Sequence, residues 1–159
     1  MEQRINGFKS GQGAMKALLG VGAYLAKSPI EKRLLQLVDY RVSQINGCAY
    51  CLDMHSKDLR AGGETEQRIY MLAGWRETPL YTDRERAALA WAEAVTLVHE
   101  GHVPDEVFEQ ARAQFSEEEL VDLTLAITTV NAWNRVNIAF RTTPGGYQPG
   151  MFDSFFAAG

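Results

Sequence analysis

This sequence has few of the residues that build disulfide frameworks or metal sites, because its 159 residues include only two cysteines and three histidines. In a reducing compartment, two cysteines at CxxC spacing favour a catalytic or metal-binding role over a structural staple. No apolar run is long enough to span a bilayer, and a net charge of −4 offers no basic footprint for nucleic acid. The first residues lack the charged-then-apolar order of a secretory signal. We therefore expect a cytoplasmic protein that binds neither nucleic acid nor membrane.

The sequence does contain an ordinary globular composition and strong helix signals. Hydrophobic residues make up 46% and charged residues 23% of a chain long enough to bury a core. Capping boxes begin at Thr82 and Ser116, and glycine ends a helix at Gly47 and at Gly62. Strand patterns of period two are scarce. We predict an all-α bundle with helices at about 13–27, 28–45, 48–61, 64–75, 82–99, 104–114 and 116–140.

No internal repeat, low-complexity tract or linker divides the chain. We predict a single domain over residues 1–159 with a core at about 20–141. The last stretch, at about 142–159, contains several glycines, prolines and aromatic residues. We predict that it packs as an irregular arm, with another subunit as one candidate surface.

Both cysteines and one histidine fall within the eight residues Cys48-Ala-Tyr-Cys51-Leu-Asp-Met-His55. Residues three and four apart share a helix face, and helical side chains lean toward the N-terminus, so we expect the His55 ring to point at the Cys51 sulfur. Gly47 comes directly before the motif, which puts the cysteines in a first helical turn, where the helix dipole favours thiolate. We expect a cysteine pKa below about 8.5 and a pair that can close to a disulfide.

The residues of this motif leave three interpretations open. A thiol beside an imidazole and a second thiol is typical of redox or nucleophilic chemistry. Zinc would bind Cys48, Cys51 and His55, but a structural site needs a fourth ligand, for which His99 and His102 are the candidates. The third interpretation is packing alone, in which two small buried thiols flank a satisfied histidine. Haem attachment is excluded because leucine follows Cys51.

Three segments resemble the alkylhydroperoxidase AhpD-like branch of the carboxymuconolactone decarboxylase family. They read SPIEKRLL at 28–35, RVSQINGCAYCLDMH at 41–55 and NAWNR at 131–135, and the similarity covers about 20–141. The resemblance implies an all-α fold whose small protomers assemble as trimers or hexamers. Redox members of the family reduce hydroperoxides and pass electrons through the CxxC pair, whereas the decarboxylase branch lacks that pair.

The resemblance also implies a role for each residue of the motif. Cys51 matches the cysteine that attacks peroxide and becomes a sulfenic acid, and Cys48 matches the partner that donates a proton and then closes the disulfide. His55 matches the base that takes the proton of Cys51. The family further implies an external dithiol donor, such as a lipoylated protein, and a peroxiredoxin as a further partner, with no metal or organic cofactor.

The chain departs from the family pattern at a position that matters for proton transfer. The family has a glutamate twelve residues before the first cysteine, and this chain has Gln36 there, whose amide can hold an imidazole but cannot take up a proton. Tyr50 replaces a histidine of the better-studied peroxidases. The apolar stretch 87–98 predicts a buried helix that contains Glu93. We hypothesise that Glu93 partners His55; the alternative is a partly exposed Glu93 on a surface stripe.

The sequence as a whole predicts an all-α thiol peroxidase or disulfide reductase with Cys48, Cys51, His55 and Glu93 as catalytic residues. We expect the site near a subunit interface of a homo-oligomer. Two alternatives from other classes remain. One is a non-catalytic protein with structural zinc or a redox-sensing role, and the other is a lactone decarboxylase with idle cysteines.

Overall fold

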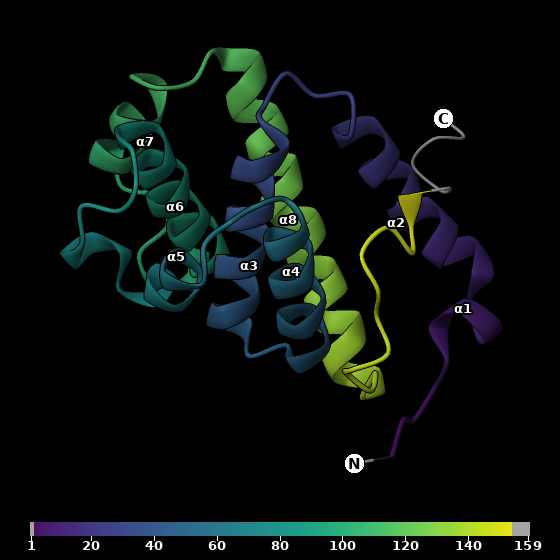
Figure 1. Ribbon diagram of the computed structural model, residues 1–159. Coiled ribbons are helices and arrows are strands. Elements are labelled where there is room, and N and C mark those ends of the chain that lie inside the picture. The colour runs from purple at the N-terminus through teal and green to yellow at the C-terminus, as the bar shows by residue number, and fades with distance from the viewer. Residues whose placement is uncertain (1, 154–159) are drawn as a thin grey trace.

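Helices make up all the regular secondary structure of residues 2–153, the part of the chain that the computed structural model describes (Figure 1). The predicted all-α class is confirmed. The bounds in chain order are α1 Gly7–Ser10, α2 Gln12–Leu25, α3 Lys32–Asn46, α4 Ala49–Ala61, α5 Glu66–Met71, the 3-10 helix η1 Leu72–Glu77, α6 Asp83–Thr96, the 3-10 helix η2 Val98–Glu100, α7 Asp105–Arg112 and α8 Glu117–Phe140.

The bundle is built around α3, which packs against α4, α6 and α8. In Figure 1, α5, α6 and α7 lie on one side of this central group, and α1 and α2 lie on the other. Leu34, Val38 and Val42 of α3 belong to a buried cluster with α6, α7 and α8. Leu37 joins a second cluster with α4, α5 and η1. Burial of each such side chain stabilises the fold by roughly 1.5–3 kcal/mol, so α3 is fixed on several faces.

Local signals set several helix ends as predicted. Thr82 and Ser116 form capping boxes with Glu85 and Glu119 at the starts of α6 and α8. Gly47 ends α3 in the left-handed conformation, at φ 67°, which glycine adopts without the steric penalty of a Cβ.

The start of α3 differs from its prediction. The helix begins at Lys32 rather than at Pro29. Ser28, at the predicted start, does not cap the helix, because its hydroxyl donates a hydrogen bond of 2.6 Å to the carboxylate of Asp122 on α8. A contact between distant segments therefore replaces a local cap.

Other predicted helices are shorter or divided. The stretch 64–75 forms two helices, α5 and η1, and the second is interrupted at Gly74, where φ is −104° and ψ is 26°. The helix predicted to reach residue 99 ends at Thr96, after which η2 follows. The short helix α1 was not among the predicted helices.

Residues 142–152 follow α8 as an irregular segment that packs on α4 of the same chain. Lys57 donates hydrogen bonds to the carbonyl oxygens of Gly145 and Tyr147, at 3.2 and 3.1 Å. The buried Tyr147 donates its hydroxyl proton to Asp58 at 2.8 Å. The described part of the predicted arm is therefore irregular, and it packs on α4 of the same chain. The end of the arm lies outside the described residues.

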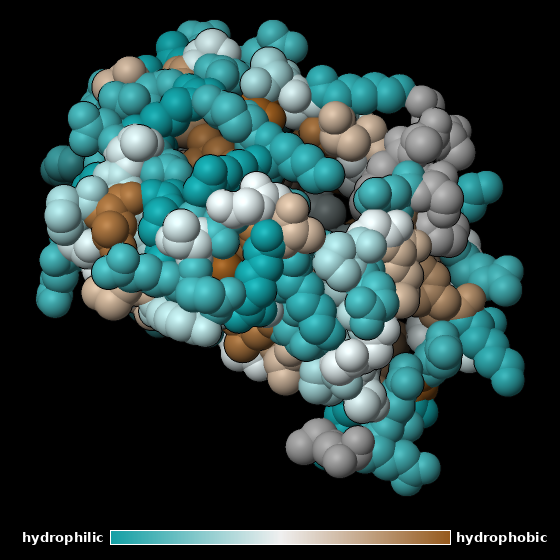
Figure 2. All heavy atoms as spheres, in the orientation of Figure 1, coloured by the Kyte–Doolittle hydropathy of each residue, from teal (hydrophilic) through white to brown (hydrophobic). Residues whose placement is uncertain are grey.

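The face of the molecule in Figure 2 is largely polar, and its hydrophobic residues are scattered in separate groups. Within residues 2–153, no helix combines the length and the apolar character that crossing a membrane requires.

Candidate functional site

The hairpin of α3 and α4 carries the cysteine motif. Cys48 is the N-cap residue of α4, and its sulfur accepts a hydrogen bond from the backbone N–H of Cys51 at 3.3 Å. A hydroxyl or carboxylate oxygen usually has this capping role. The two cysteines are joined as a disulfide with their Cα atoms 5.3 Å apart, and each is 1% exposed. The prediction that the pair can close a disulfide at the start of a helix is confirmed.

His55 lies one helical turn after Cys51 on the buried face of α4, which also includes Leu59. Burial lowers the pKa of His55 to about 4, so the imidazole is neutral at pH 7. The predicted shared face is thus confirmed. In this disulfide form, the His55 side chain makes no hydrogen bond to either sulfur or to any other side chain that the structure describes.

Gln36 occupies the position of the family's glutamate but is not a partner of the imidazole. No hydrogen bond joins Gln36 to His55 in the described part of the chain. Its Oε1 atom instead lies beside the C-terminal end of α4, where a Cβ added to Gly62 would be 3.3 Å away. Gln36 therefore packs against the end of α4.

Glu93 has partners other than the expected His55. Its carboxylate accepts hydrogen bonds of 2.8 Å from Arg41 Nε and from Trp75 Nε1, and a further one from Arg76. Burial by itself would raise the pKa of Glu93, but the hydrogen bonds from Trp75, Arg76 and Arg41 outweigh burial and lower that pKa. The expected burial is present, since the side chain is 13% exposed. The expected His55 contact is corrected: α6 packs on α3, and Glu93 faces Arg41.

Asp39 is an acidic residue of the α3–α4 hairpin that the sequence reasoning missed. It is half-buried on α3, one turn after Gln36. Burial, and after it the negative charge of Asp58 on α4, raises the pKa of Asp39 to about 7. Burial also raises the pKa of Asp58. The available signal was spacing, because Asp39 stands one helical turn along α3 from the position already in question.

A network of amides locks α3 to α8 beside the disulfide. Asn46 Nδ2 donates to Asn131 Oδ1 at 2.9 Å and to Asn134 Oδ1 at 2.8 Å. The fully buried Asn134 in turn donates to the Ser43 hydroxyl at 3.1 Å. These bonds satisfy buried polar groups that would otherwise destabilise the core, and they fix how α8 lies against α3.

Asn137 lies one turn further along α8 and faces the disulfide. Its Nδ2 atom donates a hydrogen bond to the Cys51 sulfur at 3.6 Å. The sequence contains no signal that pairs Asn137 with a sulfur 86 positions away.

The zinc interpretation finds no ligand set in the described part of the chain. Residues 2–153 contain no group of three or more His, Cys, Asp or Glu side chains arranged to hold a metal ion. The candidate fourth ligands, His99 in η2 and His102 just after it, belong to the connection between α6 and α7.

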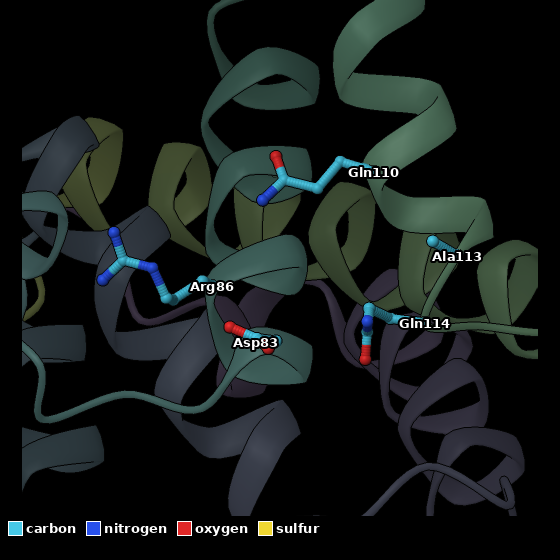
Figure 3. A pocket seen from close by; sticks show the side chains of 5 residues that line it. All are labelled: Asp83, Arg86, Gln110, Ala113 and Gln114. Carbon is cyan, nitrogen blue, oxygen red and sulfur yellow. The ribbon is translucent and has the colours of Figure 1, made fainter.

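A surface hollow of about 230 Å³ lies between α6 and α7, away from the cysteine motif (Figure 3). Polar side chains line most of it, and none of its lining residues belongs to α3, α4 or α8. They are Asp83, Arg86, Gln110, Ala113 and Gln114. The cysteine motif therefore does not line this hollow.

Comparison with known proteins identifies the family of the chain. The model of the carboxymuconolactone decarboxylase family matches residues 12–94. The uncharacterized protein YdfG of Bacillus subtilis (strain 168) is 43% identical over 139 residues, which cover 87% of this chain and 95% of that protein. The chain therefore belongs to the carboxymuconolactone decarboxylase family, in its AhpD-like branch.

Two solved structures have a fold similar to that of this chain. A protein of unknown function from Agrobacterium tumefaciens, suggested to be the antioxidant defence protein AhpD, is 44% identical with a TM-score of 0.88, over 92% of this chain and 100% of that one. The debrominase Bmp8 has the same fold, with a TM-score of 0.75 at 23% identity over 86% of this chain and 74% of its own. A fold shared with a debrominase does not fix the reaction, which has to be argued from the site.

The protonation of His55 is directly measurable. In the disulfide form we expect its imidazole signals to titrate with a midpoint at about 4, against about 6.5 in the unfolded chain. Because the folded-state pKa is the lower one, His55 withdraws stability as the pH falls from about 6.5 toward 4. Nuclear magnetic resonance of the imidazole across this range is the measurement. A midpoint near 6.5 would show that His55 is not buried in solution.

The raised pKa of Asp39 makes the stability of the fold depend on pH in the opposite direction. Its pKa is 3.8 ordinarily and about 7 in the fold, so between these values the folded protein binds the extra proton and stability falls as pH rises. Asp39→Asn removes this loss. Relative to wild type, we expect the variant to gain about 2 kcal/mol between pH 4 and pH 8, roughly half of what three pKa units represent. Urea unfolding of the disulfide form at both pH values measures the gain.

Asp53 on α4 provides the matched control. Lys57 donates to it at 2.8 Å, and this hydrogen bond lowers the pKa of Asp53. Stability from Asp53 is therefore present above its ordinary pKa and lost as the pH falls. Asp53→Asn should be less stable than wild type at pH 8 and approach it toward pH 3. If Asp39→Asn behaves in the same way, the assigned cause of its pKa is incorrect.

Glu93→Gln tests whether this carboxylate is structural. Removing the negative charge leaves the largely buried guanidinium of Arg41 without an ionic partner, and we expect a loss of about 2–3 kcal/mol in unfolding free energy. The exposed pair Arg60–Glu66 is the control, and Glu66→Gln should cost less than about 0.5 kcal/mol. The reduction potential of the disulfide should not change in either variant. If the reduction potential of the disulfide changes in Glu93→Gln but not in Glu66→Gln, Glu93 does take part in the thiol chemistry.

Proposed function

We propose that this protein is a thiol-dependent hydroperoxide reductase and disulfide reductase in which Cys51 attacks the peroxide and Cys48 resolves the product. The observation that carries the proposal is the Cys48–Cys51 disulfide in the first turn of α4, with His55 one turn further on the same buried face. The CxxC spacing lets the pair alternate between dithiol and disulfide with little backbone movement.

In the first step, His55 takes the proton of the Cys51 thiol, and the thiolate attacks the terminal oxygen of a hydroperoxide. An S–O bond forms, the O–O bond breaks, and the departing alkoxide takes up a proton as an alcohol. Cys51 is oxidised to a sulfenic acid while the peroxide is reduced. Cys48 then attacks the Cys51 sulfur, which forms the disulfide and releases water.

The neutral state of His55 supports its role as the base. A buried imidazole with a pKa of about 4 in the uncharged disulfide form is free of a proton at pH 7. After reduction, a thiolate at Cys51 would put a negative charge one turn away, and an opposite charge raises the pKa of a histidine. Proton transfer from Cys51 to His55 therefore creates an ion pair in which each charge stabilises the other.

The disulfide must be reduced again by thiol–disulfide exchange with an external dithiol. Family membership supports a lipoylated protein as donor and a peroxiredoxin as client in the cytoplasm, together with a trimeric or hexameric assembly. Both cysteines are 1% exposed in one chain, so a donor reaches them only if the site opens. Glu93 is left out of the catalytic set because Arg41, Trp75 and Arg76 hold its carboxylate.

Anaerobic titration of the reduced protein with an alkyl hydroperoxide tests the function. We expect one equivalent of alcohol, and a Cys48–Cys51 peptide that is two hydrogens lighter by mass spectrometry. Cys48→Ser should stop at a sulfenic acid on Cys51 that dimedone traps. Cys51→Ser should lose about a hundredfold or more in rate, because the nucleophile is gone.

Histidine variants provide the control for this titration. His55→Asn should slow the reaction with peroxide, whereas His99→Asn, whose side chain is 74% exposed in the wild type, should not. Stepwise oxygen gain at one sulfur without a disulfide would contradict the proposed cycle. Lactone decarboxylation that survives Cys51→Ser would point to the decarboxylase activity instead, and stoichiometric zinc lost in Cys48→Ser would point to a structural metal site.

A further inference from the structure

The Cys51 sulfur receives a hydrogen bond from another helix. Asn137 stands in the last turns of α8, half-buried, and its amide Nδ2 lies 3.6 Å from the Cys51 Sγ atom. The two residues are 86 positions apart in the chain. An N–H donor directed at the sulfur that attacks peroxide bears on the chemistry of that sulfur.

The position of Asn137 is fixed by the rest of α8. One turn earlier, Asn134 is fully buried and bonded to both Ser43 and Asn46 of α3. At the end of the helix, the Asn137 carbonyl accepts the backbone N–H of Thr142 at 2.9 Å. The amide is therefore presented to Cys51 from a rigid element, and little entropy is lost when the hydrogen bond forms.

We propose that Asn137 is a catalytic residue that stabilises the Cys51 thiolate through its side-chain amide. The inference rests on the proposed function, in which Cys51 is the attacking sulfur. A disulfide sulfur is a weak acceptor, whereas a thiolate carries a full negative charge, and hydrogen bonds to charged groups are roughly twice as strong as neutral ones. The contact in the disulfide form therefore strengthens when the sulfur is reduced and ionised.

Asn137 and His55 do different work in this arrangement. An amide neither gains nor loses a proton near neutral pH, so Asn137 donates its hydrogen bond at every pH at which the protein is folded. His55 changes protonation when it takes the proton of Cys51. The amide has the same role when the disulfide is reduced. The external dithiol attacks Cys48, the S–S bond breaks, and Cys51 leaves as the thiolate that Asn137 stabilises.

The test uses Asn137→Leu, which keeps the approximate volume and removes the donor. In a Cys48→Ser background, the pH dependence of alkylation by iodoacetamide reports the Cys51 pKa. We expect that pKa to rise by about one unit, which leaves a tenfold smaller thiolate fraction below the pKa. With both cysteines present, the same tenfold change lowers the disulfide reduction potential by about 30 mV.

Three further variants separate chemistry from packing. Asn137→Asp places a negative charge beside the sulfur and should raise the Cys51 pKa more than Asn137→Leu, and Asn137→Gln keeps an amide and should restore part of the shift. Asn131→Leu is the matched control, because Asn131 bonds to Asn46 and Thr96 and does not contact the sulfur. It should lower stability and leave the Cys51 pKa unchanged.

A folded Asn137→Leu protein with unchanged Cys51 pKa and unchanged reduction potential would overturn the inference. If Asn137→Leu does not fold, equal Cys51 pKa values in Asn137→Asp and Asn137→Gln would overturn it as well. The outcome is distinct from failure of the proposed function. If wild type reduces no hydroperoxide but Asn137→Leu still raises the thiol pKa, the peroxidase proposal falls and the role of Asn137 at the sulfur stands.

Discussion

The site depends on the backbone conformation of Gly47. Its left-handed φ of 67° lets α3 end and α4 begin within two residues, which makes Cys48 the N-cap and brings Cys51 into the first turn. A Cβ at this position would meet no atom within 4 Å, so the requirement for glycine comes from the backbone and not from crowding. The left-handed conformation costs other residues roughly 1–2 kcal/mol. One flexible residue thus places both sulfurs among the unpaired N–H groups of a helix start.

Burial gives the site its second constraint, which is electrostatic. In the disulfide form the sulfurs are uncharged and His55 is neutral, so the buried face of α4 carries no charge there. A thiolate at Cys51 would be costly in this setting unless other groups compensate it. The surroundings supply that compensation as a neutral imidazole able to accept a proton and as the amide of Asn137. The disulfide is therefore the electrostatically relaxed state, and charge develops in the site only after reduction.

The features that the sequence predicted are those that depend on neighbours within about four residues. The capping boxes, the break at Gly47 and the shared face of Cys51 and His55 all follow from local spacing. The partners of Glu93 do not, because a stretch that is apolar nearly all round gives no preferred direction for one acidic side chain. Its bond to Arg41 spans 52 positions and depends on how α6 is rotated against α3. The contact between Asn137 and Cys51 depends in the same way on packing between distant helices.

Gln36 leaves its position without an acidic group, but the hairpin still contains a carboxyl group nearby on α3. Asp39 lies one turn further along α3, half-buried and facing the charge of Asp58 on α4. A carboxyl group with a pKa of about 7 titrates in the range where thiol chemistry operates, whereas His55 in the disulfide form does not. The charge of the hairpin therefore changes near neutral pH as Asp39 titrates. A buried negative charge raises the pKa of another acidic group nearby. Ionised Asp39 therefore raises the pKa of the cysteine pair, and a thiolate raises that of Asp39, by an amount that depends on the distance between them.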